Sequence, residues 1–263
     1  MSEDAGPLLK VLAVLVYALL LAPVAIVLVI SFSADTFIVF PPSGYSLRWY
    51  ERVFANQVLM QGLKLSAILA LVVAGLSLLV GLPAAYAIAR GLVPGAAVLK
   101  AFFLAPLLLP TLVVGLALLM ALQPWRLTAT LTGLALGHMV VTVPFVIRLM
   151  VTTFATLPQE VEAAAASLGA TPWRVFRRVT LPLALPGLAA SAFLAFLLSF
   201  DETVISLFLS GPRASTLPVE LVRYVEGRTD PLVAALSVIL IAGTIGVVLI
   251  VERLVGVVRV IGK

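Results

Sequence analysis

Long uncharged hydrophobic runs alternate with short polar segments along almost the whole chain. A helix rises about 1.5 Å per residue, so about 20 apolar residues are needed to cross about 30 Å of hydrocarbon. The pattern predicts six membrane-spanning helices, at residues 11–30, 65–89, 101–122, 127–150, 183–209 and 232–251. An even number of spans places both termini on the same side. The sequence therefore predicts an all-α integral membrane protein in one transmembrane domain, residues 1–263.

The composition agrees with this pattern. The chain has 263 residues, of which 62% are hydrophobic and 11% charged, whereas soluble domains are nearer a quarter charged. Its Lys and Arg are scattered through the loops without a basic face, so no nucleic-acid partner is expected. The absence of cysteine excludes disulfides and thiolate metal sites. The amino terminus lacks a cleavable signal pattern, so the first apolar run is expected to stay as an anchor in the membrane lipid.

One polar interval, residues 160–186, lies between two apolar runs. It contains the start and stop residues expected of two short helices. Gly169 is placed to end the first helix in a left-handed turn, where the lack of a Cβ removes the steric penalty. Thr171 and Pro172 are placed to begin the second, as a capping hydroxyl and a proline that loses no hydrogen bond. Lys and Arg are slightly more frequent on the side that holds this interval, which favours a cytoplasmic position for it and for both termini.

This interval resembles the EAA loop of ABC importer permeases, here residues 154–182. The family pattern is Glu-Ala-Ala, three residues, Gly, nine residues, an aliphatic, one residue, and Leu-Pro. Residues of this chain that fall on the pattern are Ala164, Ala165, Gly169, Val179, Leu181 and Pro182. Ala163 stands at the glutamate position, and Glu162 lies one residue earlier.

The resemblance implies a type I ABC importer permease of the MetI-like fold, with cytoplasmic coupling helices, in the bacterial inner membrane. It implies a second homologous permease, two copies of an ABC ATPase and an extracytoplasmic solute-binding protein as partners. ATP and Mg would be bound by the ATPase, and the missing GxxxxGK[ST] motif agrees that this chain holds no nucleotide cofactor. The residues implied in ATPase coupling are Glu160, Glu162, Ala163, Ala164, Ala165, Gly169, Pro172, Arg174, Leu181 and Pro182.

The same interval leads to a mechanical hypothesis, in which the EAA loop moves as a rigid lever when the ATPase subunits close. Its arginines, Arg174, Arg177 and Arg178, are expected to face the partner. Trp173 and Phe176 are expected to press on the membrane domain.

Asp201 and Glu202 interrupt the apolar stretch 183–209 and are the sharpest polar signal inside a predicted span. A charge at the bilayer centre costs about 2.5–3.5 kcal/mol on insertion scales. Neighbouring side chains of a helix point about 100° apart, so at least one acid should face a cavity or a partner. Two interpretations are open: the acids line a path for a cationic substrate, or Asp201 reaches the outer interface, where water or Arg213 stabilises it.

Several further segments resemble the polyamine (spermidine/putrescine) permeases. They are Leu198-Ser-Phe-Asp-Glu-Thr-Val-Ile, Ser210-Gly-Pro, Thr216-Leu-Pro, Arg48-Trp-Tyr and Leu104-Ala-Pro-Leu-Leu-Leu-Pro. The substrate-pathway residues that this resemblance implies are Trp49, Thr111, Ser199, Asp201 and Glu202. Thr111 stands where spermidine permeases carry an aspartate. Permeases for iron, opines, thiamine or aminophosphonates share much of this frame, so their solutes are alternatives.

The remaining polar residues favour neither an enzyme nor a metal site. His138 is expected to hydrogen-bond a neighbouring helix, because a metal would need further imidazoles or carboxylates nearby. No nucleophile–base set stands out, so no catalytic residue is expected. The alternative functional class is an ATP-independent channel or secondary transporter. Such a protein would have no function for the polar interval 160–186.

Overall fold

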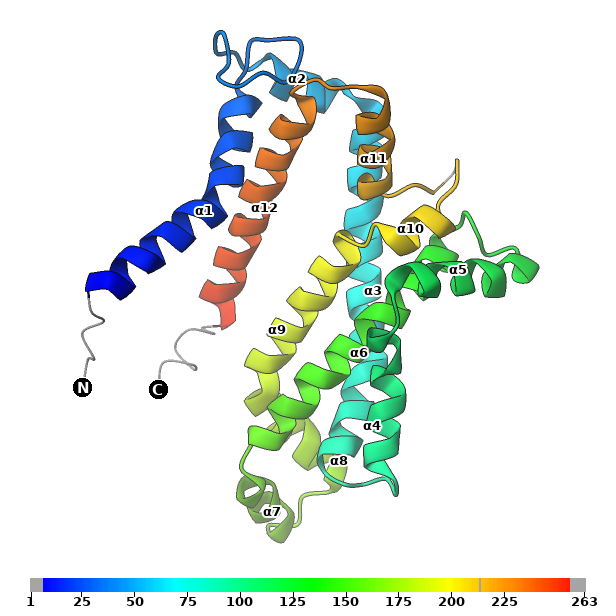
Figure 1. Cartoon of the computed structure of the whole chain (residues 1–263). Coiled ribbons are helices and arrows are strands. Elements are labelled where there is room, and N and C mark those ends of the chain that lie inside the picture. The colour runs from blue at the N-terminus through cyan, green and yellow to red at the C-terminus, as the bar shows by residue number, and fades with distance from the viewer. Residues whose placement is uncertain (1–6, 213, 256–263) are drawn as a thin grey trace. The chain divides into compact units, whose positions relative to one another are not determined.

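The computed structural model describes residues 7–212 and 214–255, and this part of the chain is built from helices (Figure 1). The α-helices are α1 (Pro7–Ser31), α2 (Arg48–Ala55), α3 (Gln57–Ala89), α4 (Ala96–Leu104), α5 (Thr111–Leu122), α6 (Leu131–Thr156), α7 (Gln159–Ser167), α8 (Pro172–Val175), α9 (Leu181–Phe200), α10 (Val204–Leu209), α11 (Leu217–Gly227) and α12 (Leu232–Val255). Short η helices are η1 (Ala105–Leu108), η2 (Gln123–Trp125) and η3 (Phe176–Thr180).

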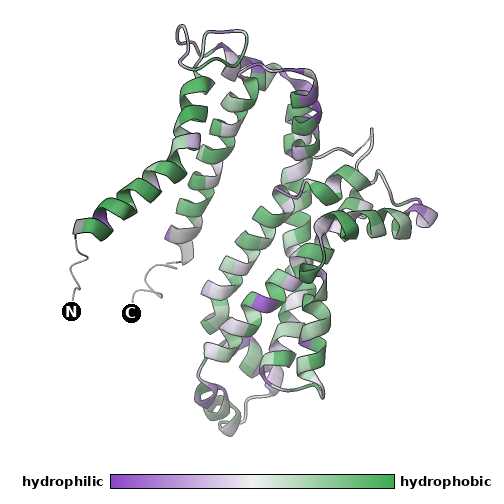
Figure 2. Cartoon of the chain, in the orientation of Figure 1, coloured by the Kyte–Doolittle hydropathy of each residue, from purple (hydrophilic) through white to green (hydrophobic). Residues whose placement is uncertain are grey.

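Within the described residues, five helices are long and apolar enough to cross a membrane, and a bent helix pair makes a sixth if it counts as one span. The five are Leu8–Ser31, Gln57–Ala89, Leu131–Thr156, Pro172–Phe200 and Leu232–Ile250. Figure 2 shows hydrophobic residues along these helices and polar residues gathered toward their ends and connections. An all-helical membrane protein is what the hydropathy pattern predicts.

The predicted span 101–122 is a bent pair rather than one straight helix. Helix α4 with η1 and helix α5 with η2 meet at 101°. Pro110 causes the break, because it offers no N–H and pushes the residue before it out of the helical region. Leu109 accordingly is extended, with φ −92° and ψ 142°.

The predicted span 183–209 is also interrupted. Helix α9 ends at Phe200, residues 201–203 leave the helical path, and the short α10 follows. The acidic pair thus lies in a break between two helices and not inside a continuous span.

The chain forms two compact units, the first of which comprises Met1–Met60 and Leu221–Val248. In this unit the hydroxyls of Ser31 and Tyr50 lie 2.7 Å apart, which ties α2 to the end of α1. Trp49 is buried, with the guanidinium of Arg52 4.7 Å from its ring centre. In the loop after α1, hydrogen bonds from the side chain and backbone of Ser43 hold the pKa of Asp35 below its usual value.

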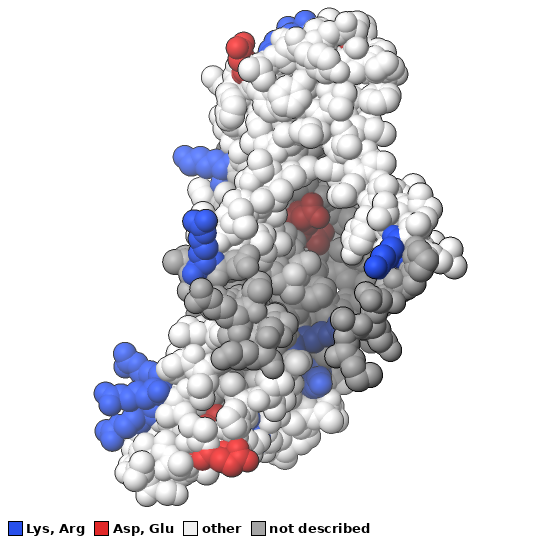
Figure 3. Space-filling view, turned by 90° about the vertical axis from the view of Figure 1, so that its left-hand side faces the viewer, with Lys and Arg blue, Asp and Glu red and all other residues white. Residues whose placement is uncertain are grey.

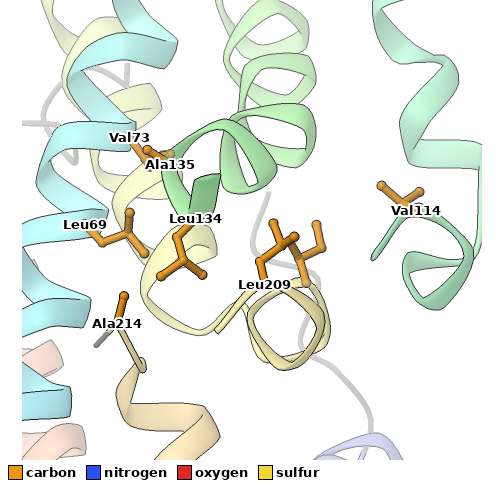
Figure 4. Close-up of a cluster of buried hydrophobic side chains, with 8 residues drawn as sticks. Leu69, Val73, Val114, Leu134, Ala135, Leu209 and Ala214 are labelled. Atoms are coloured by element: carbon orange, nitrogen blue, oxygen red, sulfur yellow. The ribbon is translucent and has the colours of Figure 1, made fainter. Parts of the chain in front are cut away.

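The second unit comprises Gln61–Glu220 and Leu249–Lys263. One of its apolar clusters joins α3, α5, α6 and α10 and is drawn in Figure 4; its members are Leu69, Val73, Val114, Leu134, Ala135, Ile205, Leu209 and Ala214. A second cluster joins α3, α6 and α9 and includes Ala85, Met150, Phe154 and Ala184. Helices α7 and α8 lie together at one end of this unit (Figure 1).

Candidate functional site: the EAA loop and the break between helices α9 and α10

Helix α7 ends as its sequence predicts. Gly169 has φ +83°, in the left-handed region that glycine adopts without a steric penalty. Its N–H donates to the carbonyl of Ala166 at 2.9 Å, and the N–H of Ala170 donates to Ala165 at 3.1 Å. This pair of bonds is the Schellman motif, which satisfies carbonyls at the helix end. The predicted left-handed turn at Gly169 is therefore confirmed.

Helix α8 begins at Pro172 but is not a separate short helix. It continues through the π-helical turn η3 into α9, so that residues 172–200 form one long helix. Pro182 offers no N–H to the preceding turn, which favours the wider π-helical bonding there; the N–H of Leu181 reaches back to Phe176.

The expectation that the Thr171 hydroxyl caps the second helix is wrong. The Thr171 side chain accepts no capping hydrogen bond, and its backbone carbonyl accepts from the N–H of Val175 at 2.9 Å. The hydroxyl belongs to an exposed residue and needs no protein partner.

The EAA loop presents an exposed, basic and partly apolar surface. Leu168 is 89% exposed and Trp173 is 68% exposed. The side chains of Arg174, Arg177 and Arg178 are also exposed. Figure 3 shows basic side chains projecting at the same end of the molecule as α7 and α8 in Figure 1.

The two aromatic residues of this loop have different surroundings. The expectation that Trp173 presses on the membrane domain is wrong, because Trp173 contacts the ring of Phe176 at 5.8 Å and is otherwise mostly exposed. Phe176 does pack inward, with its ring centre 5.0 Å from that of Tyr86 in α3. Tyr86 in turn lies edge-on to Phe154, 5.4 Å away.

Glu162 is bound within this chain. Its carboxylate receives two hydrogen bonds from Arg90, 3.0 Å from Nε and 2.7 Å from Nη2. The hydroxyl of Thr180 donates to the same carboxylate at 2.8 Å. Arg90 also donates to the backbone carbonyl of Phe154 at 2.8 Å, and both charged side chains are largely buried. The Arg90–Glu162 pair thus joins the ends of α3 and α6 to the EAA loop.

The other predicted coupling residues lie on the surface of the same loop. Exposed among them are Glu160, Ala163, Ala164, Gly169, Pro172, Arg174 and Pro182, whereas Ala165 and Leu181 are half-buried. At the position of the family's glutamate, Ala163 therefore presents a methyl group to the surface. Glu160, in the first turn of α7, is an exposed carboxylate there.

The two acids in the break between α9 and α10 have different environments. Glu202 accepts a hydrogen bond from the backbone N–H of Ile205 at 3.0 Å and so caps the start of α10. Asp201 is exposed, and among the described residues its carboxylate has no hydrogen-bond or ion-pair partner. Arg213, the alternative partner expected from the sequence, lies outside the described residues.

His138 connects the helices on both sides of this break. Its Nδ1 lies 2.9 Å from the hydroxyl of Ser199 in α9, and its Nε2 lies 3.0 Å from the hydroxyl of Ser206 in α10. All three side chains are buried. The expectation that His138 hydrogen-bonds a neighbouring helix is confirmed, and Ser199 is a partner of His138 rather than an open group.

The remaining predicted pathway residues, Thr111 and Trp49, come from other segments of the sequence. Thr111 is exposed and begins α5 directly after the bend at Pro110. Trp49 is buried in the first unit, and its indole N–H has no hydrogen-bond partner among the described residues.

Sequence reasoning missed three members of these two clusters, namely Arg90, Thr180 and Ser206. Arg90 lies 72 residues from Glu162, and Ser206 lies 68 residues from His138. The one available signal was the position of Arg90 at the end of an apolar run, where a cation is favoured beside helix carbonyls.

Known protein families and curated relatives match most of this chain. Residues 77–259 match the model of the family described as binding-protein-dependent transport system inner membrane component. The chain is 31% identical over 245 residues to the putrescine transport system permease protein PotI of Escherichia coli (strain K12), covering 90% of this chain and 86% of the relative. It is 29% identical over 235 residues to the spermidine/putrescine transport system permease protein PotC of Haemophilus influenzae, covering 89% and 91%.

Solved structures agree on the fold. A chain of a bacterial ABC transporter that imports the acidic polysaccharide alginate superposes with a TM-score of 0.70 at 18% identity, over 93% of this chain and 94% of that one. A chain of the MetNI methionine ABC transporter in an inward-facing conformation superposes with a TM-score of 0.62 at 19% identity, over 75% and 94%. Because the sequence identities are 18% and 19%, these structures support a shared fold alone.

Proposed function

Since this chain belongs to the family of binding-protein-dependent transport system inner membrane components, and is a permease subunit of an ABC importer in the inner membrane, we propose that its solute is a polyamine of the putrescine or spermidine type. The observation that carries this proposal is the exposed carboxylate of Asp201 at the break between α9 and α10, which has no hydrogen-bond or ion-pair partner among residues 7–212 and 214–255. The relatives named as putrescine and spermidine permeases support it.

A carboxylate in this position suits an ammonium group. Inside a membrane an unpaired charge is costly, so an acid there is expected to have a functional partner. Glu202 uses one carboxylate oxygen to cap α10, which leaves Asp201 as the acid that contacts the solute. In this proposal Ser199 and Glu202 support the break, and Thr111 and Trp49 contribute to the path at other points.

Replacement of Asp201 by asparagine tests the cation contact. In complexes reconstituted into proteoliposomes, Asp201→Asn should lower uptake of labelled putrescine or spermidine about tenfold, corresponding to about 1.4 kcal/mol. Stimulation of ATP hydrolysis by the binding protein should persist. Glu202→Gln is the matched control, because its amide oxygen still accepts the Ile205 N–H, and uptake should change less than threefold. Uptake by Asp201→Asn within twofold of the wild type would contradict the proposal.

A second candidate is a solute other than a polyamine, such as iron, an opine, thiamine or an aminophosphonate. One observation, at Thr111, favours it. Thr111 provides no charge where spermidine permeases carry an aspartate, and this chain has only 12 acidic residues in total. Calorimetric titration of the purified binding protein with each of these solutes distinguishes them. Tight binding of a diamine or triamine is the expected result, and binding of another solute alone would replace the polyamine assignment.

Coupling to ATP is assigned to the EAA loop. A permease of this family acts with a second permease, an ATPase and a solute-binding protein, and we assign two ATPase copies and a homologous second permease to this complex. ATP and Mg are bound by the ATPase. The exposed surface formed by Leu168, Trp173 and the neighbouring arginines would contact the ATPase in the cytoplasm. Both termini would then also lie on the cytoplasmic side.

Labelling of single cysteines tests this orientation. The chain has no cysteine, so one introduced at an exposed position is a unique probe. Leu168→Cys should react with a membrane-impermeant maleimide in inverted vesicles and not in right-side-out vesicles, and bound ATPase should protect it. Leu47→Cys, at a residue 61% exposed in the first long loop, should show the opposite sidedness. Reaction of Leu168→Cys from the outer side would contradict the cytoplasmic assignment.

A further inference from the structure

The break between α9 and α10 is bridged by one buried side chain from a third helix. His138 of α6 reaches Ser199 in the last turn of α9 and Ser206 near the start of α10. Each ring nitrogen has one hydroxyl partner, and a hydroxyl both donates and accepts, so each contact is satisfied whichever nitrogen carries the proton. Buried polar groups inside a membrane must find partners within the protein. The imidazole therefore acts as a clamp across the break.

The helix that carries this clamp lies very close to α10. A Cβ added at Gly137 would lie 2.5 Å from Cδ1 of Leu209 and 2.9 Å from Cγ2 of Ile205. A side chain larger than hydrogen at this position would force the Leu209 and Ile205 side chains of α10 to move, because real Cβ atoms do not approach other carbons so closely. The close approach brings the imidazole of the next residue within hydrogen-bond distance of Ser206.

The backbone at His138 is itself held in place. The hydroxyl of Thr142 donates to the His138 carbonyl at 3.0 Å, and it also lies 2.7 Å from the hydroxyl of Ser77 in α3. All of these side chains are buried. The His138 side chain is thus held on a base formed by α3 and α6. In the segment 201–203 that it spans, the N–H of Asp201 still bonds the carbonyl of Leu197 in α9 at 3.0 Å, and the carbonyl of Thr203 accepts from Leu207 in α10, but the three residues leave the helical path.

We propose that His138 is a positioning residue for solute transfer: by bonding Ser199 and Ser206 it fixes the two ends of the break and so holds the Asp201 carboxylate where a cationic solute passes. This inference rests on the proposed function, because it takes Asp201 as the solute contact. Glu202 contributes from within the segment by capping α10. Without the imidazole, α9 and α10 would each keep their apolar contacts but would lose the link that sets the turn between them.

A double-mutant cycle in the reconstituted complex tests the proposal. His138→Leu should lower uptake of labelled putrescine or spermidine about tenfold and leave binding-protein-stimulated ATP hydrolysis within twofold. Combined with Asp201→Asn, it should lower uptake no further than Asp201→Asn alone, because both changes remove the same positioned carboxylate. His138→Gln, whose amide both donates and accepts, should recover at least half of the uptake. Ser191→Ala, which removes a buried hydroxyl bonded within α9, is the matched control and should transport normally.

The outcomes separate this inference from the proposed function. Normal uptake by Asp201→Asn would overturn the role of Asp201 and leave the clamp without a function. Loss of uptake in Asp201→Asn, together with normal uptake in His138→Leu or fully additive losses, would overturn the positioning role alone. Equal failure of His138→Leu and His138→Gln in uptake and in ATP hydrolysis would indicate a general structural role, and would also overturn it.

A second measurement needs no transport. Asp201→Cys provides a single thiol at the break, since the chain has no other cysteine. A small cationic methanethiosulfonate should modify it at a rate that changes at least fivefold when His138→Leu is added, because the turn has moved. The same addition should not change the rate for Leu168→Cys in the EAA loop. An unchanged rate at position 201 would overturn the clamp.

Discussion

Gly169→Val should reduce solute uptake by the assembled complex to background and abolish the stimulation of ATP hydrolysis by the binding protein. The chain should still insert in the membrane at normal abundance, because Gly169 lies in the EAA loop and outside the long apolar helices. Uptake in proteoliposomes, ATP hydrolysis and immunoblotting of the membrane fraction measure these three quantities.

The reason is the local backbone conformation and not a clash with neighbouring residues. A Cβ at Gly169 would meet no atom within 4 Å, so the substitution creates no clash. Its φ of +83° is the obstacle, since an L-residue in the left-handed region costs about 1–2 kcal/mol, and a β-branched one is especially disfavoured there. Valine would therefore move to an extended conformation, break the Schellman bonds and turn α7 away from α8. The exposed surface that we propose contacts the ATPase would lose its shape.

Two control variants separate this effect from general strain. Gly169→Asn should retain most of the activity, because asparagine tolerates the left-handed conformation. Gly95→Val introduces the same strain at φ +74°, also with no atom within 4 Å, but at the start of α4 and outside the EAA loop. It should transport at least half as fast as the wild type. Full coupling in Gly169→Val, or equal loss in Gly95→Val, would contradict the coupling role of the EAA loop.

Local features of this fold are predictable from the sequence because their causes lie within a few residues. The helix end at Gly169 and the helix start at Pro172 follow from backbone preferences of those residues. The long apolar helices follow from hydropathy, since the bilayer imposes a length and leaves helices as the way to satisfy the backbone. The EAA spacing also lies within one short segment, which is why the family can be identified from it.

The two broken spans illustrate where hydropathy fails. Residues on both sides of Pro110 are equally apolar, so a hydropathy window across 101–122 does not distinguish a straight helix from one bent by 101°. The break after Phe200 is signalled by Asp201 and Glu202, but a pair of acids is equally compatible with a continuous helix facing a cavity. The deciding contacts, from His138 to both flanking helices, depend on tertiary packing.

The role of Glu162 likewise depended on tertiary structure. Glu162 lies one residue before the position of the family's glutamate, which Ala163 occupies. This shift places the Glu162 carboxylate on the face of α7 that turns to Arg90, whereas Ala163 is exposed. The displacement makes this carboxylate an internal anchor of the EAA loop. Ala163, Ala164 and Glu160 remain exposed and belong to the surface that we propose contacts the ATPase.

Charge reversal at this anchor should have the second large effect. Arg90→Glu would place two carboxylates together in a largely buried position and leave the Phe154 carbonyl without its donor. Loss of one partner from a buried ion pair costs about 3–5 kcal/mol, which corresponds to at least about a hundredfold in the population of the docked loop. Uptake and coupled ATP hydrolysis should both fall by at least that factor. Lys100→Glu, an equal change of charge at an exposed residue of α4, should leave both within twofold.

The reciprocal change identifies the pair as the cause. Glu162→Arg alone should be as damaging as Arg90→Glu, because it opposes two cations in the same place. The double variant should recover about tenfold over either single variant, since the two exchanged side chains again carry opposite charges and attract. Recovery should stay incomplete, because a glutamate at position 90 offers no donor to the Phe154 carbonyl. Arg90→Lys should be intermediate, since an ammonium keeps the charge but not the two parallel bonds. If the double variant is no better than the single ones, the ion pair does not hold the EAA loop to the spans. The loop must then be anchored by other contacts, such as that between Phe176 and Tyr86 of α3.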